Sequence, residues 1–298
     1  MKNDLIKKLL AQCSFPVSGS KVDCAVSGGA DSLALLLLAV EASLEVTVWH
    51  VDHGLRSSSS SEGLIVADIA KDLGAEAHCV KSLVLDGPNL EARARDARIS
   101  VLPAQVLTGH TADDQAETVI LNLLRGSGLQ GTSGIGEPGR RPLLNLRRAE
   151  TEKLCLSMGL EPVCDSMNFD SRFTRNRIRS EVIPLLAEVA GRDPVPILTR
   201  HALLAEEAVG LLESLTESID VTDVKSVAGT PDELVRLAIH HWLTINLGFP
   251  ADFASVKRVL HVVRGGIRAT EISGGYRVSR SKGKLKFFVN PSILSKGI

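Results

Sequence analysis

The sequence predicts a doubly wound α/β domain with a mainly parallel sheet, followed by a second, smaller and mainly helical domain. Through the first 180 or so residues, short apolar segments alternate with helical patterns, which is typical of strands covered by helices on both faces. The pattern then becomes a series of helices that ends in short strands. The 298 residues are 44% hydrophobic, which is enough for two cores. We therefore expect one domain over residues 1–185 and another over residues 186–298.

The expected elements follow one another along the chain. An amphipathic helix opens the sequence, with an apolar face formed by Leu5, Ile6, Leu9, Leu10 and Cys13. In the first domain we expect strands at residues 22–26, 45–51, 76–80 and 105–108, and helices at residues 32–42, 62–73, 90–102 and 113–124. In the second domain we expect helices at residues 181–189, 195–215, 232–243 and 251–263, then two or three short strands ending with residues 284–289.

Composition excludes several classes of protein. The basic N-terminus lacks the apolar run and cleavage site of a signal peptide, and the apolar segment 33–40 is too short to span a bilayer. A cytoplasmic protein with no membrane contact is therefore expected. The five cysteines are scattered and never spaced as CxxC, so neither a disulfide framework nor a zinc or iron–sulfur site is indicated.

A glycine-rich loop, Ser27-Gly28-Gly29-Ala30-Asp31-Ser32, joins the first expected strand to the helix after it. Glycines let the backbone approach phosphate oxygens, while hydroxyls and the amides of a helix N-terminus supply hydrogen-bond donors. The loop therefore predicts an anion site. It is not a Walker A loop, because no lysine follows the glycines. For an isolated Ser-Gly-Gly, a plain turn in which Ser27 or Asp31 caps the helix would be the simpler interpretation.

Polar residues also follow other expected strands, at the edge of the sheet where α/β proteins bind ligands. His50 and Asp52 end the second strand, and that structural role alone would explain them equally well. His110 follows the fourth strand, where an imidazole can transfer a proton or contact a phosphate. The connection over residues 126–142 contains six glycines and two prolines, which indicates a segment that is either mobile or functional.

Two expected helices carry charged residues at helical spacing. Glu91 and Arg95 share a face of one helix, where plain surface ion pairs are the commoner outcome. In the other helix, Asp113 and Asp114 suit the positive end of the helix dipole, which is the simplest explanation for them. Asp113 and Glu117 also share a face, so two acids could point together into the cleft and hold an ammonium group or a metal ion.

Seven segments together resemble a known family in order and spacing. They are SGGADS from Ser27, HVDHGLR from His50, NLEARARDAR from Asn89, TGHTADDQAET from Thr108, LLRGSG from Leu123, RPLL from Arg141 and residues 165–179. The first resembles the pyrophosphate-binding loop of the N-type ATP pyrophosphatases, or PP-loop superfamily, and matches its Ser-Gly-Gly-any-Asp-Ser pattern at every fixed position. The ordered set resembles the tRNA(Ile)-lysidine synthetases over most of residues 20–180. The resemblance implies an adenine nucleotide α-hydrolase-like fold.

The resemblance also implies an activity, that of an ATP-dependent carbon–nitrogen ligase. The family adenylates the C2 oxygen of the wobble cytidine, position 34, in an isoleucine tRNA with a CAU anticodon, and pyrophosphate leaves. Free L-lysine then joins C2 and AMP leaves. ATP is thus an implied substrate and Mg²⁺ the implied metal ion. The implied partners are the isoleucine tRNA and lysine, and a homodimer is compatible with the resemblance.

Carried over residue by residue, the resemblance implies roles for the loop and for the side chains at the strand ends. The implied ATP-binding residues are Ser27, Gly28, Gly29, Ala30, Asp31, Ser32 and His50. The implied catalytic residues are Asp31, Arg95, His110 and Asp114. Asp31 would help to hold Mg²⁺ on the leaving pyrophosphate. Asp114 is the preferred anchor for a lysine amino group, and Glu117 is the alternative.

Basic residues predict where RNA is bound. The expected tRNA-binding residues are Arg125, Arg172, Arg175, Arg177 and Arg179, and Phe173 lies among the last four. Further positive charge comes from the preceding loops, at Arg140, Arg141, Arg147 and Arg148. The alternative interpretation of residues 170–179 is a solvated basic helix start. From Arg264 onward, eight lysines and arginines face the single acid Glu271, so the C-terminal strands are expected to contact the tRNA body.

Two departures from the family pattern and two alternatives remain at this stage. Thr111 stands where the family often has a second histidine, and Met167 stands where we expect serine or proline. The chain ends earlier than the longer members, so an additional C-terminal domain is not expected. One alternative is another PP-loop enzyme that adenylates tRNA, such as a cytidine thiolase, although those carry CxxC pairs. The other is a catalytically silent RNA-binding protein, against which the intact Asp31, His110 and Asp114 argue.

Overall fold

The computed structural model describes residues 2–52, 54, 59–82, 90–136, 138–163 and 173–289, without the side chains at 59–61, 90–92, 94–96 and 138. The chain divides into two compact units, Met1–Ala205 and Glu206–Ile298. This division falls within the long helix α10 (Val195–Thr216), whereas the boundary expected from the sequence, between residues 185 and 186, lies within α9 (Ile183–Ala190). Within the described ranges, no helix is long and apolar enough to cross a membrane.

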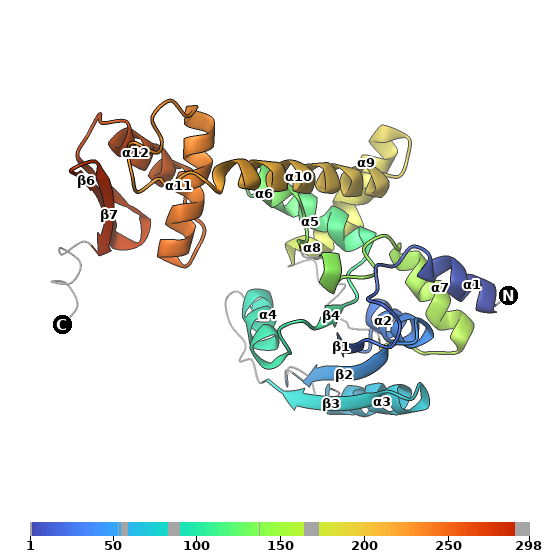
Figure 1. The fold of residues 1–298 in the computed structure, drawn as a ribbon. Helices are drawn as coiled ribbons and strands as arrows, with labels where there is room; N and C mark the ends of the chain where they lie inside the picture. The colour runs from blue at the N-terminus through green and yellow to red at the C-terminus, as the bar shows by residue number, and fades with distance from the viewer. Residues whose placement is uncertain are drawn as a thin grey trace. The chain divides into compact units, whose positions relative to one another are not determined.

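The first unit is built on a four-stranded parallel sheet (Figure 1). The strands β1 (Lys21–Ala25), β2 (Glu45–Asp52), β3 (Glu76–Lys81) and β4 (Leu107–Thr108) lie in the order β3-β2-β1-β4. The chain therefore moves outward from β1 to β3 and then returns past β1 to form β4. Such a reversal places a ligand crevice at the carboxyl ends of the two strands that flank it, which here are β1 and β4. The predicted doubly wound fold is confirmed.

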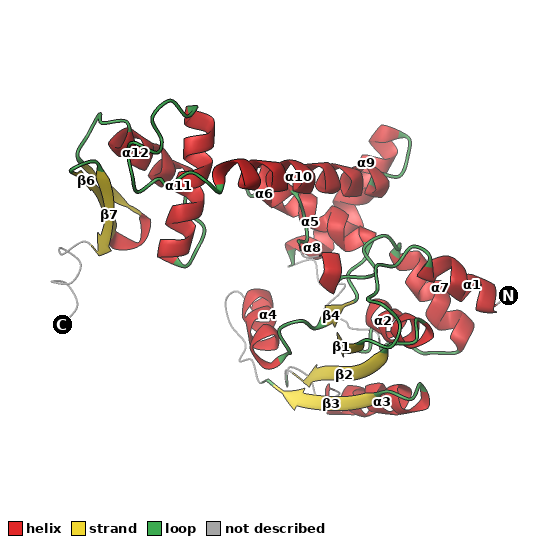
Figure 2. Ribbon diagram, viewed as in Figure 1, coloured by secondary structure: helices red, strands yellow, loops and turns green. Residues whose placement is uncertain are grey.

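Helices connect the strands and cover the sheet (Figure 2). Up to β4 they are α1 (Lys2–Leu10), α2 (Ala30–Glu41), α3 (Ser59–Asp72) and α4 (Leu90–Val101). After β4 come α5 (Ala112–Leu124), α6 (Leu129–Thr132), the 3-10 turn η1 (Pro138–Arg140), α7 (Arg148–Met158), α8 (Thr174–Arg177), the π-helical segment η3 (Ile178–Val182) and α9. In the first unit, the predicted helices begin and end within three residues of the observed ones. The sequence did not predict α7, and only two residues of the expected strand 105–108 pair with β1.

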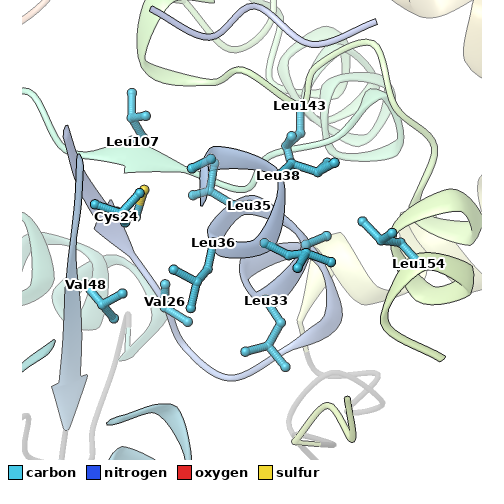
Figure 3. Close-up of a cluster of buried hydrophobic side chains, with 14 of the residues drawn as sticks. Cys24, Val26, Leu33, Leu35, Leu36, Leu38, Val48, Leu107, Leu143 and Leu154 are labelled. Carbon is cyan, nitrogen blue, oxygen red and sulfur yellow. The ribbon is translucent and has the colours of Figure 1, made fainter. Parts of the chain in front are cut away.

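The core of the first unit is centred on α2 (Figure 3). Every side chain from Ser32 to Ala39 is buried, because the helix packs against β1 and β2 and also against α1 and α7. A helix that is apolar on all sides is typical of such an enclosed position. Leu154 of α7 belongs to the same buried cluster as Leu36 of α2 and Val48 of β2. The helix that the sequence did not predict therefore completes this core.

The second unit has a core of its own. Helices α11 (Asp232–Leu247) and α12 (Phe253–Val263) accompany an antiparallel sheet formed by β5 (Ala269–Ile272), β6 (Tyr276–Ser281) and β7 (Lys284–Val289), with the 3-10 turn η4 (Ser273–Gly275) between β5 and β6. The sheet is amphipathic, since Val278 and Leu285 are buried in the cluster made with these helices while Arg277 and Lys286 are exposed. The predicted short C-terminal strands are confirmed.

The packing of α7 on α2 gives a stability prediction. Leu154→Ala should lower the free energy of unfolding by roughly 2–5 kcal/mol, because it leaves a cavity at a fully buried position. Leu156 lies on the same helix and is 81% exposed, so Leu156→Ala is the matched control and should change stability by less than about 0.5 kcal/mol. Urea unfolding measures both. Equal effects of the two substitutions would contradict the packing of α7 described above.

Candidate active site

The loop of residues 27–32 turns directly from β1 into α2. Gly28 has a φ of 92°, in the left-handed region that favours glycine. The Ser32 hydroxyl oxygen lies inside the turn, where it accepts a hydrogen bond from the Ser27 amide at 3.2 Å and donates to the Gly29 carbonyl at 2.9 Å. Because α2 begins at Ala30, the unpaired amides of its first turn lie beside this loop. These features suit the binding of an anion.

The end of β4 lies directly against this loop. A Cβ atom placed on Gly109 would lie 2.5 Å from the backbone oxygen of Asp31, so the two backbones are in close contact. The next residue is His110, whose Nδ1 is 2.8 Å from the Thr108 hydroxyl. Thr111 is buried and begins α5, and its amide and hydroxyl both donate to Asp114 Oδ2, at 2.9 and 3.0 Å. The residue that departs from the family pattern therefore orients Asp114.

Arg148, at the start of α7, lies among three carboxylates. Its guanidinium places Nε 3.2 Å from Asp31 Oδ2, Nη1 3.2 Å from Glu117 Oε1 and Nη2 2.7 Å from Asp114 Oδ1. Thr151, one turn further along α7, donates its hydroxyl to the other oxygen of Asp31. The side chains of Asp31, Asp114 and Glu117 are 23%, 17% and 1% exposed, so water and salt screen these contacts only partly.

The neighbouring arginine joins α5 to α7 a second time. Arg147 donates from Nε and Nη2 to the two oxygens of Asp113, at 3.1 and 3.0 Å, which is the bidentate geometry that suits an arginine and a carboxylate. Its third nitrogen donates to Asp193. The backbone amide of Arg148 also donates to Asp113, at 2.8 Å. The first turns of the two helices are thus held together by charged hydrogen bonds.

Two arginines of the predicted RNA-binding segment also reach α5. Arg179 donates to both oxygens of Glu117, at 2.6 and 3.1 Å. Arg175 donates from Nη2 to the Thr118 hydroxyl at 2.9 Å. Glu117 therefore has one arginine from α7 and one from η3, which explains how a carboxylate can be almost completely buried.

Two other predicted RNA-binding residues are exposed, and two further predicted site residues lie outside the described part of the chain. Arg177 pairs with Glu181, four residues along, and both side chains are exposed. Arg125 is exposed where α5 ends. Arg172 and the side chain of Arg95 lie outside the described residues.

His50 has a buried position at the end of β2. Its side chain is largely enclosed, and Nδ1 is 2.9 Å from the Val26 carbonyl oxygen. A Cβ atom on Gly63 of α3 would lie 3.3 Å from the ring, so α3 packs closely over it. The ring therefore links β2, β1 and α3 in addition to the ATP-binding role that the resemblance implies.

Burial and charge act on the acids in opposite directions. Burial raises the pKa of Asp31 above its ordinary value, although Thr151 and Arg148 oppose the change. Burial also acts to raise the pKa of Asp114, but the charges of Arg148 and His110 and the hydrogen bonds from Thr111 outweigh it, so that pKa is lowered. Two acids that contact one arginine therefore differ in their affinity for a proton.

Part of the basic charge counted in the sequence is neutralised within the chain, which corrects two expectations. Arg147 and Arg148 do not add free positive charge for RNA, since both bind carboxylates. In the second unit, Arg264 pairs with Asp232 at 2.8 Å, and Lys284 pairs with Asp223 at 2.8 Å. Glu271 is therefore not the only acid near the C-terminal basic residues, because their partners come from earlier in the chain.

Sequence reasoning assigned Arg148 to RNA and missed its contacts with the carboxylates, and it missed Thr151 and the helix that carries both residues. Two local signals for that helix exist. The Glu150 carboxylate accepts a hydrogen bond from the Arg147 amide at 3.0 Å, as in a capping box, and Gly159 ends the helix with a φ of 74°. An alternation of strands and helices does not point to such a helix, because it follows the last strand of the first unit.

Fold and site together define the class of this protein. A family model described as the PP-loop domain matches residues 2–186, which include the loop, the strand ends and the acids of α5. Among solved structures, the U34-tRNA thiolase NcsA of Methanococcus maripaludis has the same fold, with a TM-score of 0.55 at 16% identity over 68% of this chain and 79% of that one. The first unit is a PP-loop domain.

Similarity over most of the chain identifies the family. The tRNA(Ile)-lysidine synthase of Nocardia farcinica is 39% identical over 245 residues, which cover 77% of each chain. The enzyme of the same name from Mycolicibacterium paratuberculosis is 43% identical over 235 residues, covering 74% of this chain and 73% of that one. This chain belongs to the tRNA(Ile)-lysidine synthase family.

The contact between Gly109 and the loop gives one prediction. Gly109→Ala should raise the KM for ATP at least tenfold and lower the free energy of unfolding by roughly 1–3 kcal/mol, because the added methyl group would meet the backbone of Asp31. Gly139→Ala is the control, since a Cβ atom there meets nothing within 4 Å. ATP saturation curves and urea unfolding measure the two effects. An unchanged KM for ATP in Gly109→Ala would show that this backbone contact does not hold the loop in the conformation that binds ATP.

The pair of Arg147 and Asp113 gives a pH-dependent prediction. Burial acts to raise the pKa of Asp113, but hydrogen bonds from Arg147 and the Arg148 amide outweigh it and hold that pKa below its ordinary value of 3.8. Such a carboxylate stabilises the fold above the unfolded-state pKa, and the contribution is lost as the pH falls through the lower folded-state pKa. Arg147→Gln should therefore cost roughly 1–2 kcal/mol at pH 7 and progressively less below about pH 4.

Urea unfolding of the wild type and Arg147→Gln at several pH values tests this dependence. Comparing the two proteins removes the opposite contribution of Asp31, whose pKa is raised in both. Arg177→Gln, which removes an exposed pair, is the control and should produce no pH-dependent difference. A loss in Arg147→Gln that is equally large at pH 7 and pH 3.5 would show that the ion pair is not its source.

Proposed function

We propose that this protein forms lysidine at the wobble cytidine, position 34, of an isoleucine tRNA with a CAU anticodon, using ATP and free L-lysine. Its membership of the tRNA(Ile)-lysidine synthase family carries the proposal. The geometry supports it, because an anion-binding loop, a histidine and a group of carboxylates meet at the carboxyl ends of β1 and β4. ATP, a base and an amine all need to be brought to one place for this reaction.

The reaction has two displacements. The cytidine C2 oxygen attacks the α-phosphorus of ATP, an O–P bond forms, and pyrophosphate leaves. The lysine side-chain nitrogen then attacks C2, a C–N bond forms, the C2–O bond breaks with AMP as the leaving group, and the amine gives up a proton. The protein must neutralise phosphate charge, hold the reactants in line and exclude water from the activated base.

The loop residues 27–32 are proposed to bind the pyrophosphate part of ATP, and His50, buried near the end of β2, is proposed to contribute to ATP binding. His110 is proposed to contact a phosphate or to accept the proton that the amine loses. Mg²⁺ takes oxygen ligands and is usually bound by one or two carboxylates together with substrate phosphates, and the partly exposed Asp31 of the loop fits that donor set. When bound, the ion would neutralise charge on the phosphates.

Asp114 is proposed to hold an amino group of lysine, with Glu117 as the alternative. The Asp114 side chain is 17% exposed and the Glu117 side chain is 1% exposed, so a substrate reaches Asp114 more easily. Glu117 also has both oxygens occupied by Arg179, whereas Asp114 accepts a hydrogen bond from one guanidinium nitrogen at 2.7 Å, has Arg179 Nη2 at 3.8 Å and otherwise accepts from Thr111. A cationic substrate can therefore approach Asp114 with less rearrangement.

RNA binding is proposed for Arg125, Arg172, Arg175, Arg177 and Arg179, and for the basic strands of the second unit. Arg179 donates to Glu117 and Arg177 to Glu181, so the charges of these two arginines are partly neutralised within the chain. Arg95 is proposed to lie near the reacting groups on the basis of the resemblance alone.

The role of Asp114 gives a kinetic prediction. Asp114→Asn should raise the KM for lysine by roughly 10- to 100-fold while changing the KM for ATP far less, because it removes a charged hydrogen bond to the amine but can keep those from Thr111. Asp72→Asn, at an exposed position of α3, is the control. Steady-state kinetics with each substrate varied in turn separate the effects. An unchanged KM for lysine would exclude Asp114 as the anchor.

The proposed function itself is tested by the mass of an isoleucine tRNA transcript bearing CAU after incubation with protein, ATP, Mg²⁺ and lysine. Lysine-dependent gain of mass at the wobble cytidine, with release of AMP and pyrophosphate, is the expected result. Omission of lysine is the control. Unchanged RNA from folded protein would favour another acceptor or a silent RNA-binding protein.

A further inference from the structure

A cavity of about 410 Å³ lies along α5, and neither the loop residues 27–32 nor the group of carboxylates lines it. One wall is formed by the face of α5 that carries Thr118, Asn122 and Arg125, and the other by the backbone around Ile135. His110 lines it near the start of α5, and Arg141 and Arg175 also border it. We call this cavity the α5 groove.

The walls of the α5 groove are held in place by amide side chains. Asn122 donates from Nδ2 to the Gly131 carbonyl at 2.6 Å, and the Gln115 side-chain oxygen accepts from the Ile135 amide at 2.6 Å. Arg141 donates to the carbonyl of Gly136 on the same wall. The glycine-rich connection is thus fastened to α5 and forms a defined surface.

The charges that border the groove select an anion. Three guanidinium groups, those of Arg125, Arg141 and Arg175, line it, and none of its lining side chains among the described residues is acidic. Free lysine carries two ammonium groups, for which this lining offers no carboxylate. The carboxylates lie elsewhere, around Arg148. The groove therefore suits a phosphate-bearing ligand better than an amino acid.

The shape of the groove selects an elongated anion. α5 has 13 residues, which corresponds to a length of about 20 Å, and the lining residues run from His110 before the helix to Arg125 at its end. A strand of nucleic acid carries a phosphate at each nucleotide, so a groove of this length spans more than one. Leu121 and Ile135 add apolar surface against which a base can pack.

We propose that the α5 groove binds the RNA strand on either side of the reacting cytidine, with Arg175 and Arg141 on phosphates near that nucleotide and Arg125 on one further along. The inference rests on the proposed function, since His110 then marks the reacting end of the groove. Thr118 is a positioning residue. Its hydroxyl accepts from Arg175 at 2.9 Å and donates to the Asp114 carbonyl at 2.8 Å, which fixes the guanidinium at the groove.

The test is the salt dependence of binding to an RNA stem-loop that carries the CAU anticodon, followed by fluorescence anisotropy. Arg175→Gln and Arg141→Gln should each weaken binding roughly tenfold. Each should also make the slope of log K against log salt concentration shallower by about 0.7, because one phosphate contact is lost from a single strand. Arg175→Lys keeps the charge and should keep the slope. Arg200→Gln, which removes an exposed charge on α10, is the matched control and should bind like the wild type.

A crosslink locates the strand independently of affinity. A stem-loop with 4-thiouridine next to the wobble cytidine should crosslink to residues 121–125 or 134–136 in the wild type. Normal RNA affinity and slope in both glutamine variants would overturn the proposal, as would a raised KM for lysine with RNA binding intact. Wild-type protein that binds the stem-loop without forming lysidine would refute the proposed function, and the binding data would still decide whether the groove holds RNA.

Discussion

The contact of Arg148 with Asp31, Asp114 and Glu117 is the interaction on which the rest of the site depends. These carboxylates come from two helices that β1 and β4 deliver to the same end of the sheet, and without a cation they would repel one another in a poorly hydrated place. Leaving a buried charge without its partner typically costs about 3–5 kcal/mol. The guanidinium has donors in three directions, so one side chain can hold α2, α5 and α7 in register.

This arrangement places the carboxylates and the arginines of the α5 groove in two neighbouring regions. The acids gather around Arg148 near the start of α5, whereas Arg125, Arg141 and Arg175 line the α5 groove, with Arg125 where that helix ends. His110 lines the groove and also lies close enough to Asp114 to lower the pKa of that carboxyl group. A cationic amine and an anionic RNA strand would each find the opposite charge and meet at that histidine. The charge of each proposed substrate is therefore opposite to the charge of the region that would bind it.

The sequence was sufficient for the sheet, the loop and the strand ends because each depends on local pattern. Alternating apolar segments predict buried strands, and glycines between a strand and a helix predict a phosphate loop. It was insufficient for the ion pairs, since Asp31 and Arg148 are 117 residues apart and nothing in the local pattern of an arginine names its partner. The same limitation explains why Arg147 was assigned to RNA. Thr111, which seemed only to depart from a pattern, gains its role through Asp114.

The glycine-rich connection over residues 126–142 shows why composition alone does not distinguish mobility from close packing. Gly134 has a φ of 78°, and a Cβ atom there would lie 2.6 Å from the side-chain oxygen of Gln115. That oxygen accepts a hydrogen bond from the Ile135 amide. Because Gly134 has no side chain, the backbone of the connection can come close enough to Gln115 for this hydrogen bond to form. A side chain at this position would push the connection away from α5 and open the wall of the groove. Here glycine serves the site by bringing the backbone close to α5.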